Sequence, residues 1–263
     1  MKEGLHFAHG NGFPSSCYRQ LFQVLDARYD CKYIDMVGHN PHFPVTENWD
    51  YLVDELIASI REKFSHPIIG LGHSLGGVLN LLAAIKEPSL FKAVVMLDSP
   101  LLGRFKSGMV RLAKSIGLID KLTPALRTRG RRHHWQTREE LTRYLRGRPL
   151  FKTFTEECLQ DYINFGFKKT NEGYWLNFDK QVEYLIFRTI PHHLPRYEGR
   201  LTVPTALIYG DKSTVVDGFD IRYMKKKYNV NCYRVKGTHM LPMENPLMVG
   251  RQVFQVLDDL AKD

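Results

Sequence analysis

The chain has 263 residues, 43% of them hydrophobic, which suits one large α/β domain or a domain with an insertion. No apolar run approaches the roughly 18–20 residues of a membrane-spanning helix, so no membrane span is expected. The formal net charge is +9, and residues 101–198 account for it with 19 basic and 10 acidic residues. Because the rest of the chain is balanced, this segment is expected to be a separate structural unit.

The sequence also predicts a cytoplasmic protein. Residues 1–5 run directly into the first expected strand, which leaves no room for a signal peptide. The cysteines are far apart and lack the spacing of metal ligands, so we expect free thiols, no bound metal and no organic cofactor. They are Cys17, Cys31, Cys158 and Cys232.

Strands and helices are expected to alternate through the first hundred residues. Helical spacing of apolar residues predicts amphipathic helices between short apolar segments. Strands are expected at residues 5–8, 32–36 and 92–98, and a third strand starts with the apolar run at residues 66–69 and leads into Ser74; helices are expected over 18–25, 49–60 and 78–85. Such alternation predicts a parallel sheet with helices on both faces. The unbroken apolar run at residues 94–97 is typical of a strand that is buried on both sides.

The alternation stops at residue 101 and resumes near residue 199. We expect residues 101–198 to form a mostly helical insertion that lies over the sheet. Strands are again expected at residues 205–210 and 232–235, and helices at 217–228 and 246–260. The predicted organisation is therefore a core domain of residues 1–100 and 199–263, interrupted by a helical cap.

A serine stands at the turn between the third strand and the helix that follows it. The sequence Gly72-His73-Ser74-Leu75-Gly76 fits the pattern G-x-S-x-G. Such a turn strains the backbone at the serine, and its glycines allow close approach of neighbouring backbone. The turn lifts the Ser74 hydroxyl clear of the sheet, and the helix N-terminus beneath it favours developing negative charge. The alternative is a glycine-rich turn that merely contains a serine.

Three motifs at strand ends together resemble the α/β-hydrolase family. They are His9-Gly10, the pentapeptide around Ser74, and the segment from Gly237 to Pro246 that contains His239. The resemblance covers the chain from residue 4 to its end except for the insertion, whose position resembles the cap of many members. It implies an α/β-hydrolase fold with a mostly parallel sheet of about six strands, helices on both faces and a helical cap.

The resemblance also implies catalytic roles. Ser74 matches the nucleophile that attacks an acyl carbonyl, and His239 matches the base that takes its proton. His9 is expected to brace the oxyanion loop, and His73 is expected to pack inside the turn. Leu75 is expected to give one oxyanion-hole N–H group. The second donor is Asn11 or Phe13, and Phe13 is preferred.

The acidic residue departs from the commonest pattern of the family. The family often has Asp three residues after the glycine that corresponds to Gly210, where this chain has Ser213. Asp211 lies one residue after that glycine. Some members place the acid at the end of the strand after the nucleophile helix, which is Asp98 here. We prefer Asp98, since ligands of open α/β sheets bind at the carboxyl ends of strands, and keep Asp211 as the alternative.

The expected reaction is hydrolysis of a carboxylic ester or thioester through an acyl-enzyme on Ser74, with a small-molecule acyl substrate. The alternatives are a related serine hydrolase acting on a peptide, lactone or carbon–carbon bond, and a ligand-binding protein without catalysis. The insertion carries a basic run, and a positive cap would attract anionic acyl substrates. We expect a solvated cap surface there and not a site for nucleic acid or lipid head groups, because no aromatic residue interrupts the run. Its members are Arg127, Arg129, Arg131 and Arg132.

Overall fold

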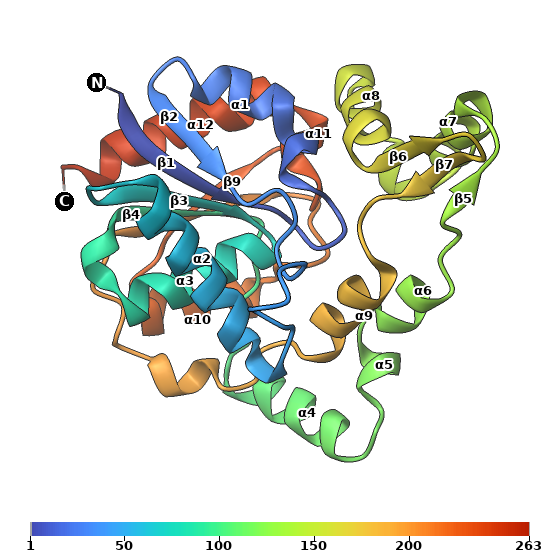
Figure 1. Ribbon diagram of the computed structural model, residues 1–263. Helices are drawn as coiled ribbons and strands as arrows, with labels where there is room; N and C mark the ends of the chain where they lie inside the picture. Colours follow the sequence, from blue (N-terminus) through green and yellow to red (C-terminus); the bar gives the residue numbers. More distant parts are fainter. Residues whose placement is uncertain (1, 263) are drawn as a thin grey trace.

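The computed structural model describes residues 2–262 and contains a six-stranded sheet with the order β2-β1-β3-β4-β8-β9 (Figure 1). Every neighbouring pair in this sheet is parallel. The strands are β1 (Glu3–Ala8), β2 (Tyr29–Tyr33), β3 (Ile68–His73), β4 (Phe91–Leu97), β8 (Thr205–Gly210) and β9 (Asn231–Val235). The predicted parallel sheet of about six strands is therefore confirmed.

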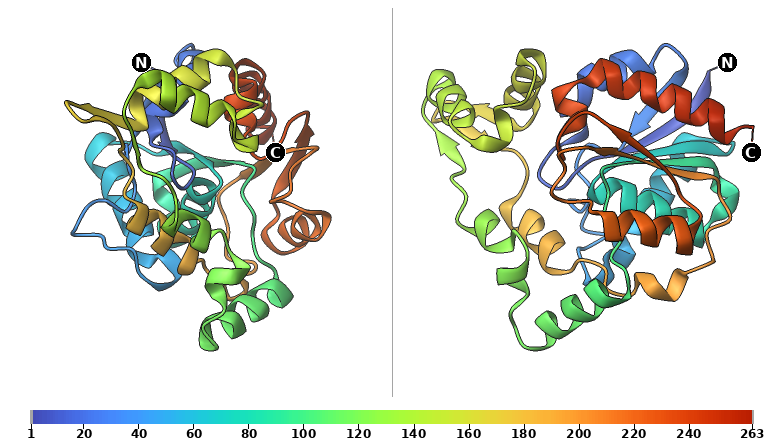
Figure 2. Two further views of the ribbon diagram at one scale, coloured as in Figure 1. Left: turned by 90° about the vertical axis from the view of Figure 1, so that its right-hand side faces the viewer. Right: turned by 180° about the vertical axis from the view of Figure 1, so that it is seen from behind.

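Helices cover both faces of the sheet (Figure 2). On one face lie α1 (Arg19–Leu25) and α12 (Pro246–Leu260), and on the other lie α2 (Asp50–Lys63), α3 (Leu75–Lys86) and α10 (Gly218–Tyr228). Successive side chains of β4 point to alternate faces: Val95 packs in the cluster under α1 and α12, and Val94 packs in the cluster under α2 and α3. A strand with two apolar faces needs the continuous hydrophobic run seen in the sequence.

The second strand begins and ends earlier than the sequence predicts. The strand was expected at residues 32–36, but β2 ends at Tyr33. Asp35 instead forms hydrogen bonds with the loop after β1. The Asp35 carbonyl accepts the Ser15 N–H at 2.8 Å, and its carboxylate accepts the Ser16 hydroxyl at 2.7 Å. These bonds hold the entry to the short helix η1 (Ser15–Tyr18).

The insertion lies beyond the carboxyl ends of the strands and has two lobes (Figure 1). One lobe is helical and contains α4 (Arg104–Ser115), α5 (Ile119–Leu122), α6 (Ala125–Arg129) and α9 (Lys180–Arg188). The other contains α7 (Arg138–Arg146), α8 (Glu156–Phe165) and a three-stranded antiparallel sheet. Its strands are β5 (His134–Trp135), β7 (Gly173–Leu176) and β6 (Phe167–Thr170), in that order.

The small sheet was not predicted, because the sequence analysis expects residues 101–198 to be mostly helical. Residues 167–176 form a tight hairpin in which Gly173 has a φ of 120°. A Cβ atom at Gly173 would lie 2.2 Å from the Trp135 carbonyl oxygen, so only glycine lets β5 pair beside the turn. The remaining helices are α11 (Leu241–Glu244), η2 (Glu47–Trp49), η3 (Pro88–Leu90), η4 (Pro149–Phe151) and η5 (Leu194–Tyr197).

In the described part of the chain, none of the helices combines the length and apolar character needed to cross a bilayer. All four cysteines are free thiols.

A buried histidine of β1 makes the stability of the fold sensitive to acid. His6 is fully buried and its Nε2 atom lies 3.0 Å from the Ser59 hydroxyl on α2. Burial, together with the nearby Lys63 charge, lowers the pKa of His6 to about 3. Since the pKa of the unfolded chain is higher, His6 gains a proton on unfolding, and its contribution to stability falls as the pH drops below about 6.5.

We therefore expect His6→Gln to flatten the acid side of the stability profile. Glutamine can keep the bond to Ser59 but cannot titrate. Between pH 6 and pH 4.5 the free energy of unfolding should fall less steeply in the variant, by about 1 kcal/mol per pH unit. Urea unfolding at a series of pH values measures this, and parallel profiles for the two proteins would contradict the assignment.

Candidate active site

The backbone at Ser74 is strained in the way that the motif predicts. Ser74 lies between β3 and α3 with φ 53° and ψ −114°, and its N–H donates to the Leu97 carbonyl at 2.9 Å. A positive φ is unfavourable for a residue with a side chain and persists only where the surroundings enforce it. The result is a partly exposed Ser74 hydroxyl group at the end of β3.

Both glycines of the motif are required by close backbone contacts. A Cβ atom at Gly72 would lie 2.2 Å from the carbonyl carbon of Gly76, and one at Gly76 would lie 2.0 Å from the Ala8 carbonyl oxygen. The N-terminus of α3 is therefore pressed against both β3 and the end of β1. The Gly76 N–H also donates to the His9 carbonyl at 3.1 Å, which ties the turn to the loop after β1.

Asp98 is fully buried directly after β4 and is held by three donors. Its Oδ1 atom accepts the Gly210 N–H at 2.9 Å, and its Oδ2 atom accepts the Ser213 hydroxyl at 2.6 Å. The third bond joins Oδ2 to Nδ1 of His239 at 2.8 Å. A buried carboxylate is tolerated only when it is paired and hydrogen-bonded, and these bonds meet that condition.

The bond to Asp98 fixes the orientation of the His239 ring. An ionised carboxylate can only accept, so Nδ1 carries the proton and Nε2 is left as the acceptor. The loop that carries His239 is braced by Glu244, which accepts the Thr238 N–H at 2.8 Å and also its hydroxyl. The ring is thus held by Asp98 through Nδ1, and its Nε2 atom is the nitrogen that Asp98 does not engage.

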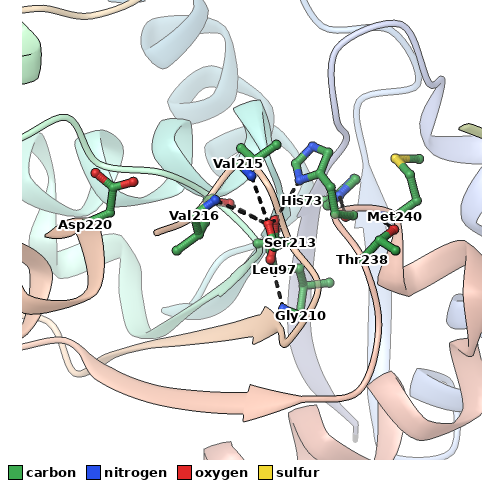
Figure 3. Close-up of polar contacts among 12 residues, drawn as sticks. His73, Leu97, Gly210, Ser213, Val215, Val216, Asp220, Thr238 and Met240 are labelled. Atoms are coloured by element: carbon green, nitrogen blue, oxygen red, sulfur yellow. Dashed lines mark hydrogen bonds and ion pairs between the residues drawn. The ribbon is translucent and has the colours of Figure 1, made fainter. Parts of the chain in front are cut away.

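The alternative acid has a different partner. The Asp211 carboxylate is exposed and accepts the Gly237 N–H at 3.0 Å. Ser213, at the position where the family often has Asp, donates to Asp98 and accepts the N–H groups of Val215 and Val216 (Figure 3). The structure therefore brings Asp98, and not Asp211, to His239.

A chain of hydrogen bonds runs from the loop after β1 to His239. The sequence does not suggest it. The Gly10 N–H donates to the Tyr18 oxygen at 3.1 Å, and the Tyr18 hydroxyl lies 2.7 Å from Nδ1 of His73. Nε2 of His73 lies 2.9 Å from the His239 carbonyl, to which it donates. Burial and the neighbouring His239 lower the pKa of His73 to about 3, so the ring is neutral and can hold both bonds.

His73 therefore does more than pack, because its ring joins two loops. Tyr18 lies at the start of the helix expected over residues 18–25, and nothing in the spacing of residues 18 and 73 indicates their contact. The expected bracing role of His9 does have a structural counterpart. Its Nε2 atom accepts the Val37 N–H and its Nδ1 donates to the Gly10 carbonyl, both at 2.8 Å. Burial lowers the pKa of His9 to about 4.

The loop after β1 forms a tight turn that engages the N–H group of Phe13, the preferred second oxyanion donor. The Phe13 N–H donates to the Gly10 carbonyl at 3.1 Å, and Gly12 has a φ of 81°. The preference for Phe13 does not fit this geometry, since its N–H is used within the turn. The N–H of Asn11, at the first corner of the turn, takes no part in the bond that closes it. Its side chain donates to the Glu183 carbonyl of α9 at 3.0 Å.

Ser74, His73 and His239 border a cavity of about 760 Å³ between the core and the insertion. Most of the lining is apolar, and residues from both lobes contribute to it. The apolar lining includes Trp49, Leu102, Trp135, Phe151, Phe167 and Ile186. A cavity of this size is large enough for a small organic ligand. No group of three or more His, Cys, Asp or Glu residues suited to a metal ion occurs within residues 2–262.

The basic run of the insertion does not form one continuous surface. Arg131 borders the cavity, where it pairs with Glu183 at 3.0 Å and donates to the Tyr162 hydroxyl at 2.6 Å. Arg132 pairs with Glu140 at 2.5 Å. Arg127 and Arg129 remain exposed. Half of the run is therefore neutralised by partners that lie 8 or more residues away in the sequence.

The fold and the arrangement at the strand ends agree with the comparison to known families. The alpha/beta hydrolase family matches residues 7–249 of this sequence. The chain therefore belongs to the alpha/beta hydrolase family, and the fold class predicted from the sequence is confirmed. A relative from Bacillus subtilis (strain 168), named uncharacterized hydrolase YugF, is 24% identical over 259 residues, covering 92% of this chain and 86% of the relative.

Solved structures show the same fold at low sequence identity. An E-2-(acetamidomethylene)succinate hydrolase superposes with a TM-score of 0.76 and 18% identity, over 98% of this chain and 91% of the other. A thioesterase domain from the curacin biosynthetic pathway superposes with a TM-score of 0.74 and 16% identity, over 97% and 91%. At this identity the likeness concerns the fold alone.

Two glycine substitutions test the packing at the serine turn. Gly76→Ala should lower the free energy of unfolding by about 2 kcal/mol or more, because the new methyl group overlaps the Ala8 carbonyl. Gly108→Ala, in the exposed interior of α4 with no atom within 4 Å of the new Cβ, should raise it by about 0.5–1 kcal/mol. Denaturant unfolding measures both values, and equal effects would refute the proposed contact.

Proposed function

We propose that this protein is a serine hydrolase that cleaves a carboxylic ester or thioester. Ser74 is the nucleophile, His239 the general base and Asp98 the acid that orients it. One observation carries the proposal: the 2.8 Å bond between Asp98 and His239, with the strained Ser74 and His239 on the same cavity. This combination supplies a base with a fixed tautomer and a hydroxyl group at a strand end.

In the first half of the reaction, the Ser74 oxygen attacks the substrate carbonyl while Nε2 of His239 takes the hydroxyl proton. Asp98 stabilises the imidazolium ion that forms. Collapse of the tetrahedral intermediate breaks the bond to the alcohol or thiol, which leaves with the proton from His239. Water then attacks the acyl-enzyme with His239 again as base, and the acid product leaves Ser74 free.

The negative charge on the tetrahedral oxygen needs two N–H donors. Leu75 is the first residue of α3, so its N–H has no acceptor within the helix. We propose Asn11 as the second donor in place of Phe13, because the turn from Gly10 to Phe13 leaves the Asn11 N–H outside its internal bond. The Asn11 side chain is anchored on α9, which holds this loop in place.

The lining of the cavity supports a small acyl substrate that carries an anionic group. Arg127 and Arg148 border the cavity, and no salt bridge joins either of them to a carboxylate within residues 2–262. Two unpaired cations beside an apolar cavity favour a ligand with an acyl chain and a carboxylate or phosphate. By their names, the two solved structures reported above act on a succinate derivative and on a thioester. Both substrates are compatible with an anionic or acyl ligand in this cavity.

A fluorophosphonate probe tests the nucleophile directly. We expect covalent labelling of the wild-type protein at Ser74 and a loss of labelling in Ser74→Ala, since only an activated serine reacts. Ser99→Ala is the matched control and should be labelled normally, because its hydroxyl is buried against the Leu97 carbonyl. A folded wild-type protein that is not labelled would instead support the ligand-binding alternative.

Paired substitutions test the acid. Asp98→Asn should lower kcat on a p-nitrophenyl ester or acyl thioester by about 10²–10⁴-fold, because the amide no longer fixes the His239 tautomer. Asp211→Asn should change kcat by less than about threefold, since among the described contacts the Asp211 carboxylate accepts only the Gly237 N–H, and an amide oxygen can accept the same bond. The reverse order of effects would refute the assignment of Asp98.

A further inference from the structure

Helix α4 has two apolar faces, and only one of them is covered. Ser107, Val110 and Ala113 point into the protein and are buried. Phe105, Met109, Leu112 and Ile116 follow each other at intervals of four, three and four, which places them on one face of the helix. This second face is open to solvent, and Phe105 is 80% exposed and Leu112 is 60% exposed.

The next two helices also carry exposed leucines, and α5 packs against α4 while α6 packs against α5. Leu118, Leu122 and Leu126, in and beside α5 and α6, are each between 43% and 50% exposed. Seven of the eleven large hydrophobic residues that are exposed within residues 2–262 thus belong to residues 105–126. Scattered exposed hydrophobic residues need no explanation, but such a concentration marks an interaction surface. We call these seven side chains the apolar cap face.

The segment that forms the apolar cap face is also rich in Lys and Arg. Residues 104–130 contain seven Lys and Arg residues and one acidic residue, Asp120. Some of the cations are neutralised: Arg104 pairs with Glu198, and Lys106 pairs with Asp217 and Asp220. Within residues 2–262 no salt bridge involves Arg111, Lys121, Arg127 or Arg129, and all four are exposed. Exposed leucines and unpaired cations therefore lie together on α4 to α6.

We propose that the apolar cap face docks on the surface of an anionic lipid bilayer. An interfacial helix of this kind buries Phe and Leu side chains at the level of the acyl chains while Lys and Arg bind the anionic head groups. Self-association through the same face would bring the unpaired cations of two copies together, which disfavours a symmetric dimer. The helices α4 to α6 lie at an outer edge of the molecule, away from the six-stranded sheet (Figure 1).

The docked orientation would bring the cavity close to the membrane. Leu102, just before α4, and Pro124 and Arg127, at α6, border the cavity as well as the helices of the apolar cap face. Docking itself needs no chemistry at Ser74, so it goes beyond the proposed hydrolysis and can be tested separately from it.

Cosedimentation of the full chain with vesicles tests the proposal. The vesicles are phosphatidylcholine alone, and phosphatidylcholine with about 30% phosphatidylserine. We expect binding to the anionic vesicles that weakens as NaCl rises from 0.1 to 0.5 M. Ser74→Ala should bind like the wild type, so that a failure of docking and a failure of the proposed hydrolysis are distinguishable.

Two pairs of variants locate the surface. Phe105→Ser with Leu112→Ser should weaken binding by at least about tenfold, whereas Leu247→Ser, at a residue 50% exposed on α12, should not. Arg111→Ala with Lys121→Ala should weaken binding by about tenfold or more, whereas Lys225→Ala with Lys226→Ala on α10 should not. Circular dichroism checks that each variant is folded.

Three results would overturn the proposal. They are no binding to anionic vesicles at millimolar lipid, equal binding to both kinds of vesicle, and equal loss in the control variants. A wild-type dimer in analytical ultracentrifugation that Leu112→Ser dissociates, in a protein that does not bind vesicles, would assign the face to self-association instead.

Discussion

The buried carboxylate of Asp98 is the interaction on which the site depends. It receives bonds from the end of β8, from Ser213 in the loop beyond it, and from His239 after β9. This carboxylate thus joins the end of its own strand, β4, to the ends of β8 and β9, which lie more than 100 residues further along the chain. Because an unpaired buried charge is costly, these loops stabilise the carboxylate while the carboxylate orders the loops.

A second set of hydrogen bonds fixes the loops on the opposite side of the site. His73 and Tyr18 link the loop after β1 to the backbone of His239, and His9 links the same loop to Val37. Both imidazoles are kept neutral by burial, so each ring offers one donor and one acceptor. The histidines around Ser74 therefore divide into two that hold loops and one, His239, to which we assign the proton transfer in the proposed reaction.

Much of this arrangement follows from local patterns in the sequence. Apolar runs and helical spacing are enough for the parallel sheet, and the turn around Ser74 follows from its glycines, since close contact leaves no space for a side chain. Features that depend on distant partners are different. The early end of β2 at Tyr33 and the neutralisation of Arg131 by Glu183 both involve bonds that spacing does not reveal.

The small sheet of the insertion shows the same limit. Its strands are two to four residues long, too short for alternation to separate them from loops, and Gly173 permits the pairing for a reason visible only in three dimensions. Likewise, the helical spacing of Phe105 to Ile116 indicates an amphipathic helix, but not which side of it the protein covers.

The contact of Ser213 with Asp98 bears on how the position of the acid can change among related sites. The Ser213 hydroxyl donates to the same Asp98 oxygen that bonds to His239. The residues that follow β4 and β8 therefore meet beside one imidazole ring. Positions 98 and 213, after β4 and β8, therefore both lie close to Nδ1 of His239, since Ser213 bonds to the oxygen that His239 bonds to. During evolution the acid could move from position 98 to position 213, with a hydroxyl group taking its place at position 98, while His239 and Ser74 stay where they are.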